Sequence, residues 1–364
     1  MIYRAIGVMS GSSLDGLDVA FAEFQENAGK WSHEIRQADC YSYSNEWTAK
    51  LKTAISLNAL DYQLLHVEYG HHIGQQVNKF IEENNLHYQV ALISSHGHTT
   101  FHVPSKKMTA QLGDGAAIAS ETQLPVVTDL RALDLAFGGQ GAPIVPIGEK
   151  LLLGDYDFFL NLGGIANISF NAEPYIAFDI CAANRVLNML AGNAGKDYDD
   201  GGQIAESGKI NQELLNKLNE LEYYKQPHPK SLANDFGTDT VYPLIKDSKS
   251  KTEDALRTYV EHIVIQIRNA IRSATVLNRG TGGSMLVTGG GAFNNFLVER
   301  LKKQLKDLNI QVIVPEENLI KYKEAMIMAF IGVLRWRQEY NILSSVTGAA
   351  RDTIGGALWI GQEA

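Results

Sequence analysis

Apolar runs and stretches of helical periodicity alternate along the first third of the chain. Residues 2–9 (IYRAIGVM) predict a buried strand, and residues 17–24 predict a second strand that closes a hairpin across the polar turn 10–16. In 60–84 the apolar residues recur at helical spacing, which predicts one buried stripe made of Leu60, Leu64, Val67, Ile73, Val77 and Phe80. Further predicted elements are helices at 46–58 and 114–122 and strands at 90–97 and 125–130.

A second hairpin is predicted near the middle of the chain. Residues 157–162 and 165–170 indicate two strands joined by Gly163-Gly164, and 253–277 has the apolar spacing of a long helix. The other predicted elements are strands at 176–180 and 284–288, helices at 183–191, 293–306 and 323–338, and a last strand or helix at 355–360.

The strand, glycine turn and strand at the N-terminus thus recur about 150 residues later. A repeat of this size predicts two similarly built α/β domains, although two common hairpins can also coincide. Because no low-complexity linker separates the halves, we expect packed domains with a cleft between them. We place the N-terminal domain at 1–130 plus about 340–364, and the C-terminal domain at 131–339.

Composition narrows the class of protein. The 364 residues suit two domains, and 45% hydrophobic with 20% charged residues is typical of a folded globular chain. A net charge of −9 argues against nucleic acid or an anionic membrane as the main partner. The two cysteines, Cys40 and Cys181, form no disulfide framework, and neither a secretory signal nor a membrane span is predicted. We therefore expect a cytoplasmic protein.

Three glycine-containing turns follow predicted strands, at Ser10–Gly16, Gly163–Asn167 and Gly289–Asn294. Glycine lets consecutive backbone N–H groups approach one anion, so the turns predict a triphosphate held by the first two, with the third against adenosine. One such turn is usually only a turn, but three across both halves favour phosphate binding. Neither a P-loop nor a dinucleotide fingerprint occurs. The predicted ATP contacts are Ser10, Gly11, Ser12, Ser13, Asp15, Gly16, Gly163, Gly164, Asn167, Gly289, Gly290 and Gly291, with Asp15 also a Mg²⁺ ligand.

These turns lie within motifs that carry a family resemblance. The segment 9–19 (MSGSSLDGLDV) resembles the opening motif of the anhydro-N-acetylmuramic acid kinases. Similar motifs follow in order over nearly the whole chain, namely SHGHT (95–99), QLGDG (111–115), DLR (129–131), GGQGAP (138–143), NLGGIANI (161–168), FD (178–179), TGGGA (288–292) and VTGA (346–349).

The resemblance implies two duplicated ribonuclease H-like domains of the actin, hexokinase and Hsp70 type, with a central nucleotide cleft. It implies an enzyme that uses ATP and Mg²⁺ on 1,6-anhydro-N-acetylmuramic acid, an amino sugar of cell-wall recycling. Such an enzyme opens the anhydro bridge with water and phosphorylates O6, which gives N-acetylmuramic acid 6-phosphate and ADP. The resemblance also favours a homodimer.

Three motifs depart from the family pattern. The usual HGQT is HGHT at 96–99, the usual DTGPGN is DICAAN at 179–184, and the usual KSTGRE is KSLAND at 230–235. These changes favour a divergent branch and leave two alternatives open. One is a related sugar kinase with another substrate; the other is a catalytically degenerate protein that binds ATP and sugar. A chaperone-like ATPase is disfavoured because no residues remain for a peptide-binding domain.

Asp179 occupies the position of the family's catalytic aspartate. Our hypothesis is that Asp179 activates the water that attacks the anomeric carbon, while the γ-phosphoryl group captures O6. We expect Asp179 just past a strand, at the start of a loop, where an aspartate that only caps the loop is the alternative reading.

The predicted substrate contacts are His96, His98, Asp114, Arg131, Gln140, Asn184 and Glu324. Arg131 suits a carboxylate such as the lactyl group, or else a structural salt bridge, and Gln111 and Asp134 are further candidates. Gln140 and Asn184 contact either sugar or backbone. The spacing of His96, His98 and His102 could also indicate a zinc site, which leaves a metal-dependent hydrolase as an alternative. Their position at a strand end better suits hydrogen bonding to substrate.

Overall fold

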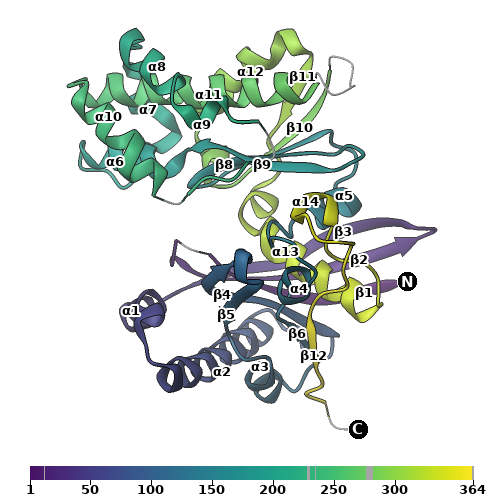
Figure 1. The fold of residues 1–364 in the computed structure, drawn as a ribbon. Helices are drawn as coiled ribbons and strands as arrows, with labels where there is room; N and C mark the ends of the chain where they lie inside the picture. The colour runs from purple at the N-terminus through teal and green to yellow at the C-terminus, as the bar shows by residue number, and fades with distance from the viewer. Residues whose placement is uncertain (12, 228–229, 234, 276–281, 363–364) are drawn as a thin grey trace. The chain divides into compact units, whose positions relative to one another are not determined.

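The computed structural model of the protein describes residues 1–11, 13–227, 230–233, 235–275 and 282–362 (Figure 1). Ser12, one of the predicted phosphate contacts, and the predicted end of the long helix at 276–277 lie outside these residues. The chain divides into two compact units, unit 1 (residues 1–154 and 322–364) and unit 2 (residues 155–321). Each unit is built on its own mixed sheet.

Unit 1 has a sheet in which the order is β12-β6-β4-β1-β2-β3, with β5 paired to β4. Its first strand pairs antiparallel with the second and parallel with β4, which makes the predicted N-terminal hairpin the centre of the sheet. The strands are β1 (Ile2–Ser10), β2 (Gly16–Asn27), β3 (Lys30–Ser42), β4 (Leu92–Val103), β5 (Met108–Leu112), β6 (Val126–Thr128) and β12 (Ala357–Trp359).

The helices of unit 1 are α1 (Asn45–Thr53), α2 (Ala59–Glu83), α3 (Gly115–Thr122), α4 (Ala132–Ala136), α5 (Pro146–Leu152), α13 (Glu317–Trp336, whose first turn belongs to unit 2) and α14 (Ser344–Thr347). Helix α13 packs directly on the sheet, because a Cβ on Gly7 of β1 would overlap the carbonyl oxygen of Ala325, and one on Gly332 would meet Ser94 of β4. This packing joins most of α13 to unit 1.

The predicted domain limits differ from the observed units in two segments. Residues 131–154 and 322–339, which the sequence analysis assigns to the C-terminal domain, both belong to unit 1. The periodicity of a helix identifies its apolar face but not the sheet that the face covers, and the glycine contacts of α13 are made in space rather than along the chain.

Unit 2 has the sheet order β11-β10-β7-β8-β9. The strands are β7 (Phe158–Leu162), β8 (Ile165–Phe170), β9 (Ile176–Ala182), β10 (Gly283–Thr288) and β11 (Ile310–Ile313), and the helices are α6 (Asn184–Gly192), α7 (Gln203–Ser207), α8 (Gln212–Asn219), α9 (Glu222–Lys225), α10 (Tyr242–Asp247), α11 (Thr252–Thr275) and α12 (Asn295–Leu305). The helices lie together over one side of this sheet in Figure 1.

The two sheets share one connectivity around their hairpins. In unit 1 the hairpin β1–β2 is extended by antiparallel β3 on one side and by parallel β4 and β6 on the other. In unit 2 the hairpin β7–β8 is extended by antiparallel β9 and by parallel β10 and β11. Both predicted hairpins are therefore confirmed, at equivalent places in the two sheets.

One predicted stripe is wrong in its first half. Leu60, Leu64 and Val67 of α2 are exposed, at 68%, 59% and 42% of their surface, whereas Ile73, Val77 and Phe80 are buried as expected. The inward face of the first half is made by Leu65 and Tyr69 instead.

Strand β3 was not predicted, because none of its residues is fully buried and its sequence shows no apolar run. Among the described residues, no helix is long and apolar enough to cross a membrane.

Candidate active site

The first glycine turn connects β1 to β2 and is tightly packed where it rejoins the sheet. Ser10 is the buried last residue of β1, while Ser13 and Asp15 are exposed at the turn. A Cβ on Gly16 would lie 2.7 Å from Cys40 Sγ and 2.7 Å from the Tyr41 carbonyl oxygen, so β3 approaches β2 too closely for a side chain here. The turn thus exposes serine and aspartate groups above a rigid glycine junction.

Carboxylates gather at the same end of unit 1. The pKa of Asp18 is raised to about 6, mainly by burial and also by the negative charges of Glu324 and Asp15, while a hydrogen bond with Cys40 opposes the rise. Asp18 is not among the predicted site residues, although it belongs to the same motif as Asp15. Mutual repulsion among these carboxylates means that a cation bound here would relieve an electrostatic cost.

The residues fit a Mg²⁺ ion shared with phosphate better than a resident metal. No group of three or more His, Cys, Asp or Glu residues forms a metal site within the described ranges. Mg²⁺ in nucleotide sites needs only one or two carboxylates, because phosphate oxygens and water supply the rest. Asp15 is exposed at the turn and can serve in that way.

Arg131 and His96 carry buried nitrogens without partners. Neither Arg131 Nε nor His96 Nε2 makes a hydrogen bond within the described residues. Burial lowers the pKa of Arg131 to about 10, against the favourable charge of Glu324. Burial also lowers the pKa of His96 to about 3, with the positive charge of Arg131 contributing. Buried polar atoms of this kind usually have a partner, so these two suit an anionic or polar ligand.

The other histidines of the motif are engaged elsewhere. His98 Nδ1 lies 3.0 Å from Ser10 Oγ, and His102 Nδ1 lies 3.2 Å from Thr109 Oγ1. The three histidines therefore have separate partners rather than a common centre, which gives the zinc alternative no geometric support.

Two further candidates are tied into the fold of unit 1. Asp114 caps α3 by accepting a hydrogen bond from Ala117 N at 2.7 Å. Asp134 is fully buried and accepts hydrogen bonds from Gly141 N and Thr347 Oγ1, both at 2.7 Å. Gln140, in the GGQGAP turn, is exposed, and its backbone N–H donates to the Thr347 carbonyl oxygen. Asp134 therefore fastens the GGQGAP turn that presents Gln140.

The second glycine turn, in unit 2, is held by the start of α6. Ala183 N donates to the Gly164 carbonyl oxygen at 2.8 Å, and Asn184 N donates to the Gly163 carbonyl oxygen at 3.0 Å. The Asn184 side chain donates to the Leu162 carbonyl oxygen at 2.8 Å. Asn184 is thus a backbone contact, the second of the two roles that the sequence left open for it.

The third glycine turn packs against the second. Gly289 has φ 80°, and a Cβ there would collide with Asn161 Oδ1. A Cβ on Gly291 would lie 2.6 Å from Leu162 Cβ and 3.0 Å from Asn184 Oδ1. The two turns therefore share one small space that tolerates no side chains at these positions.

A row of polar side chains crosses the sheet of unit 2 beside these turns. Thr288 of β10 pairs with Asn161 of β7, which pairs with Asn167 of β8, which pairs with Asp179 of β9. Directly paired residues share one face of a sheet, so the four side chains lie side by side. Thr288 Oγ1 is buried and has no hydrogen-bond partner among the described residues. Thr288 and Asn161 are not among the predicted site residues, because the strand register that aligns them with Asp179 is decided by pairing in space.

Asp179 lies inside β9, within the predicted strand 176–180, so the expectation that it starts a loop is wrong. The strand continues through Cys181 and Ala182, where the family pattern has a glycine-proline loop. Asp179 Oδ2 accepts hydrogen bonds from Leu232 N at 2.9 Å and Ser231 Oγ at 3.2 Å. Burial raises the pKa of Asp179, and these two bonds oppose the rise. Among the described residues both bonds fall on Oδ2, which leaves Oδ1 to accept from water.

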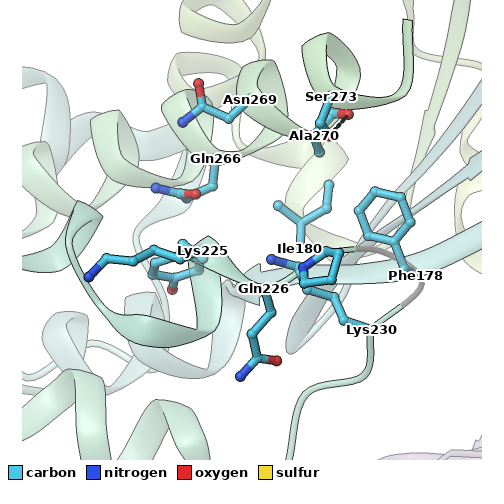
Figure 2. A pocket seen from close by; sticks show the side chains of 11 residues that line it. Phe178, Ile180, Lys225, Gln226, Lys230, Gln266, Asn269, Ala270 and Ser273 are labelled. Carbon is cyan, nitrogen blue, oxygen red and sulfur yellow. Dashed lines mark hydrogen bonds between the residues drawn. The ribbon is translucent and has the colours of Figure 1, made fainter. Parts of the chain in front are cut away.

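The opposite face of β9 borders a pocket of about 400 Å³ (Figure 2). Phe178 and Ile180 alternate with Asp179 along the strand and so face the pocket, which Gln266 and Asn269 of α11 also line. Lys230, on its rim, donates to the Tyr223 carbonyl oxygen, and Tyr223 donates to the Asp179 carbonyl oxygen at 2.7 Å. The pocket thus lies behind the strand rather than beside the Asp179 carboxylate.

Comparison with known proteins gives consistent full-length matches. The anhydro-N-acetylmuramic acid kinase of Francisella tularensis subsp. novicida is 32% identical over 375 residues, which cover 97% of each chain. That of a Sulfurovum species is 32% identical over 369 residues, covering 98% of this chain and 99% of the relative.

Among solved structures, the activator of the 2-hydroxyisocaproyl-CoA dehydratase from Clostridium difficile, with bound ADPNP, aligns with a TM-score of 0.45 at 12% identity. The alignment covers 92% of this chain and 96% of that one. The family model described as anhydro-N-acetylmuramic acid kinase matches residues 3–361. With this match and the full-length relatives, the chain belongs to the anhydro-N-acetylmuramic acid kinase family.

Proposed function

We propose that the protein is an ATP-dependent kinase that hydrolytically opens 1,6-anhydro-N-acetylmuramic acid and phosphorylates O6. The products are N-acetylmuramic acid 6-phosphate and ADP. Family membership supports the reaction, and the observation that carries it in this chain is Asp179, a half-buried carboxylate with a raised pKa and one oxygen left for water. A carboxylate with a raised pKa is a stronger base, so it accepts the proton of the attacking water more readily.

The proposed chemistry needs one carboxylate. Asp179 accepts a proton from water as the water oxygen attacks the anomeric carbon. The bond from that carbon to O6 breaks, and O6 takes the γ-phosphoryl group while ADP leaves. The phosphoryl group replaces the general acid that a glycosidase supplies with a second carboxylate. Neighbouring Ser231 and Leu232 orient Asp179 through its Oδ2.

ATP is proposed to bind the glycine turns of both units. Support comes from the tight junctions at Gly16, Gly289 and Gly291, where the backbone packs too closely for side chains. Asn167 and Thr288 add polar groups in the row beside Asp179. Mg²⁺ is proposed at Asp15, close to Asp18, where it neutralises phosphate charge when bound.

The sugar is proposed to contact Arg131, His96 and Glu324 in unit 1. The unpartnered Arg131 Nε and His96 Nε2 suit the lactyl carboxylate and a hydroxyl group, because a guanidinium pairs well with a carboxylate. Glu324 is half-buried on α13 and interacts electrostatically with Arg131. Exposed Gln140 remains a proposed sugar contact, whereas the bonds of Asp114 and Asn184 are accounted for by helix capping and turn bracing.

The proposed architecture is a pair of duplicated ribonuclease H-like domains of the actin, hexokinase and Hsp70 type, with nucleotide in a central cleft. The matching strand connectivity of the two sheets supports duplication. Both phosphate turns lie in the equivalent hairpin, which is what a clasp of one triphosphate requires.

The test is a coupled ADP-release assay over a sugar panel with product mass. The panel contains 1,6-anhydro-N-acetylmuramic acid, N-acetylmuramic acid, N-acetylglucosamine and levoglucosan, each with and without Mg²⁺. We expect Mg²⁺-dependent ADP release with the anhydro sugar, and a product heavier by one phosphate and one water. Turnover of another sugar alone indicates a related kinase of changed specificity. ATP binding without turnover indicates a degenerate binding protein, which the altered segment 180–183 favours.

A further inference from the structure

A buried chain of hydrogen bonds runs beneath the first glycine turn. His98 of β4 lies opposite Ser10 of β1 in the parallel register, with Nδ1 3.0 Å from Ser10 Oγ. Tyr43, just after β3, donates its hydroxyl to Ser10 Oγ at 2.8 Å. The Tyr43 hydroxyl lies 2.5 Å from that of Tyr69, which α2 buries completely. Strands β1 and β4, helix α2 and the segment after β3 are therefore linked by one hydrogen-bonded chain at the end of β1.

Counting protons assigns the donors in this chain. A hydroxyl has one proton, and that of Tyr43 is given to Ser10, so Tyr69 must donate to Tyr43. The contact between Ser10 Oγ and His98 Nδ1 fits either tautomer of the ring, and the tautomer that accepts the Ser10 proton completes the chain. This requires a neutral imidazole that carries its proton on Nε2, and burial of His98 lowers its pKa and so favours the neutral ring.

Burial of these hydrogen-bonded side chains favours a single arrangement of their protons. Ser10 is 3% exposed and His98 is 7% exposed, so water cannot easily replace either partner. A buried hydroxyl that loses its acceptor pays the desolvation cost of an unmade hydrogen bond. With that tautomer Ser10 keeps its proton directed at His98, and presents a lone pair rather than a proton to any ligand of the turn.

We propose that His98 is a positioning residue for nucleotide binding, which fixes Ser10 and through it the start of the phosphate turn, rather than a contact of the sugar. The proposal rests on the proposed function in that the ligand of this turn is ATP. It replaces the direct sugar contact expected from the sequence, and it also removes the Ser10 hydroxyl from the donors available to phosphate. Exposed Ser13 remains a donor on the same turn.

The test compares two changes at His98 with a matched control. His98→Asn places an amide oxygen near the position of Nδ1 and keeps the acceptor, while His98→Leu removes it at similar size. His102→Asn makes the same change at an exposed histidine of the same strand. For each protein, MgATP affinity is measured by calorimetry, and KM for ATP and for the anhydro sugar, with kcat, by ADP release.

We expect His98→Leu to weaken MgATP binding and raise KM for ATP by about 3- to 10-fold, the range of one net hydrogen bond. KM for the sugar should change less than about 2-fold. His98→Asn should recover most of the ATP affinity, and His102→Asn should match the wild type. In ¹⁵N NMR of the wild type, the His98 signals, identified by their loss in His98→Asn, should show an unprotonated Nδ1 and a protonated Nε2.

Several results would contradict the positioning role of His98, and each can be told apart from the others. A rise in sugar KM with ATP affinity unchanged would return His98 to the sugar site and overturn the proposal. A protonated Nδ1 would overturn it independently of activity, as would failure of His98→Asn to bind ATP better than His98→Leu. If His98→Leu does not fold, the NMR measurement and the comparison of His98→Asn with His102→Asn still decide. Wild-type protein that binds no ATP refutes the proposed function itself, and the positioning role with it.

Discussion

The two hairpins that open the two sheets have the same topology but are secured in different ways. In unit 1, side chains secure the strand end, through Ser10, His98 and Tyr43. In unit 2, backbone carbonyl groups of Gly163 and Gly164 accept hydrogen bonds from the start of α6. One turn therefore depends on protonation states and hydroxyl directions, and the other depends on the absence of side chains.

This difference suggests a division of labour within the proposed enzyme. The carboxylates with interacting charges, Asp15, Asp18 and Glu324, belong to the hairpin end of unit 1. The catalytic candidate Asp179 belongs to unit 2, beside the turn secured by backbone. Substitutions at the carboxylates of unit 1 and at Asp179 should therefore separate effects on ion binding from effects on the chemical step.

The largest effect is expected at Asp179. Asp179→Asn keeps the size of the side chain but cannot accept a proton from water, so kcat should fall by about 10²- to 10⁴-fold. MgATP affinity, measured by calorimetry, should stay within about 2-fold of the wild type. Unchanged turnover would show that Asp179 only secures the segment at Ser231 and Leu232.

Alanine at the glycine junctions probes the steric part of the comparison. Gly289→Ala places a Cβ against Asn161 Oδ1 at φ 80°, so it combines strain with a collision and should destabilise unit 2 by about 1–3 kcal/mol. Gly16→Ala has only the collision with Cys40 and Tyr41. Urea unfolding should rank Gly289→Ala as the more damaging. Gly348→Ala is the control for positive φ without a clash, since no atom of the described part of the chain lies within 4 Å of its Cβ position.

The pH dependence of stability tests the carboxylate cluster. The pKa of Asp18 is about 6 in the folded protein and lower when unfolded, so the folded state binds the extra proton between about pH 4 and 6. Ionised Asp18 thus costs stability above pH 6, and the cost disappears as the pH falls toward 4. Asp18→Asn should be more stable than the wild type at pH 7 by roughly 1–2 kcal/mol and equal near pH 4.

Measuring this difference by urea unfolding at several pH values cancels the opposite trend from buried histidines. Burial lowers the pKa of His96 and of His262 to about 3, so both remove stability as the pH falls below 6.5. These residues are common to both proteins. A difference between wild type and Asp18→Asn that does not depend on pH would contradict the raised pKa of Asp18.

The smallest effect is expected from the hydroxyl of Tyr43. Tyr43→Phe removes the donor to Ser10 and leaves a buried Tyr69 hydroxyl without its acceptor, which should cost about 0.5–1.5 kcal/mol of stability. Tyr340→Phe serves as a control at a tyrosine of unit 1 that is 59% exposed. Equal losses of Tm in the two variants would mean that the chain beneath the first turn is not specially stabilising.

Much of the local structure was predictable because it depends on neighbours along the chain. The strands 2–9, 157–162 and 165–170 were predicted within one or two residues, and the helix of 60–84 was predicted with the wrong face in its first half. Glycine turns can be recognised from their composition, and the family resemblance identified Asp179 as the catalytic candidate. The strand containing Asp179 was cut short, since β9 runs on through Ala182.

The sequence alone therefore determined most of the long elements, the repeated hairpins and the glycine content of the turns, because helical and strand periods and glycine conformations are local properties. Tertiary structure alone decided that His98 meets Ser10, that Thr288, Asn161 and Asn167 line up with Asp179, and that most of α13 packs in unit 1. Strand register and helix docking bring together residues up to hundreds of positions apart. Their energies depend on burial and close packing in space, which no local pattern records.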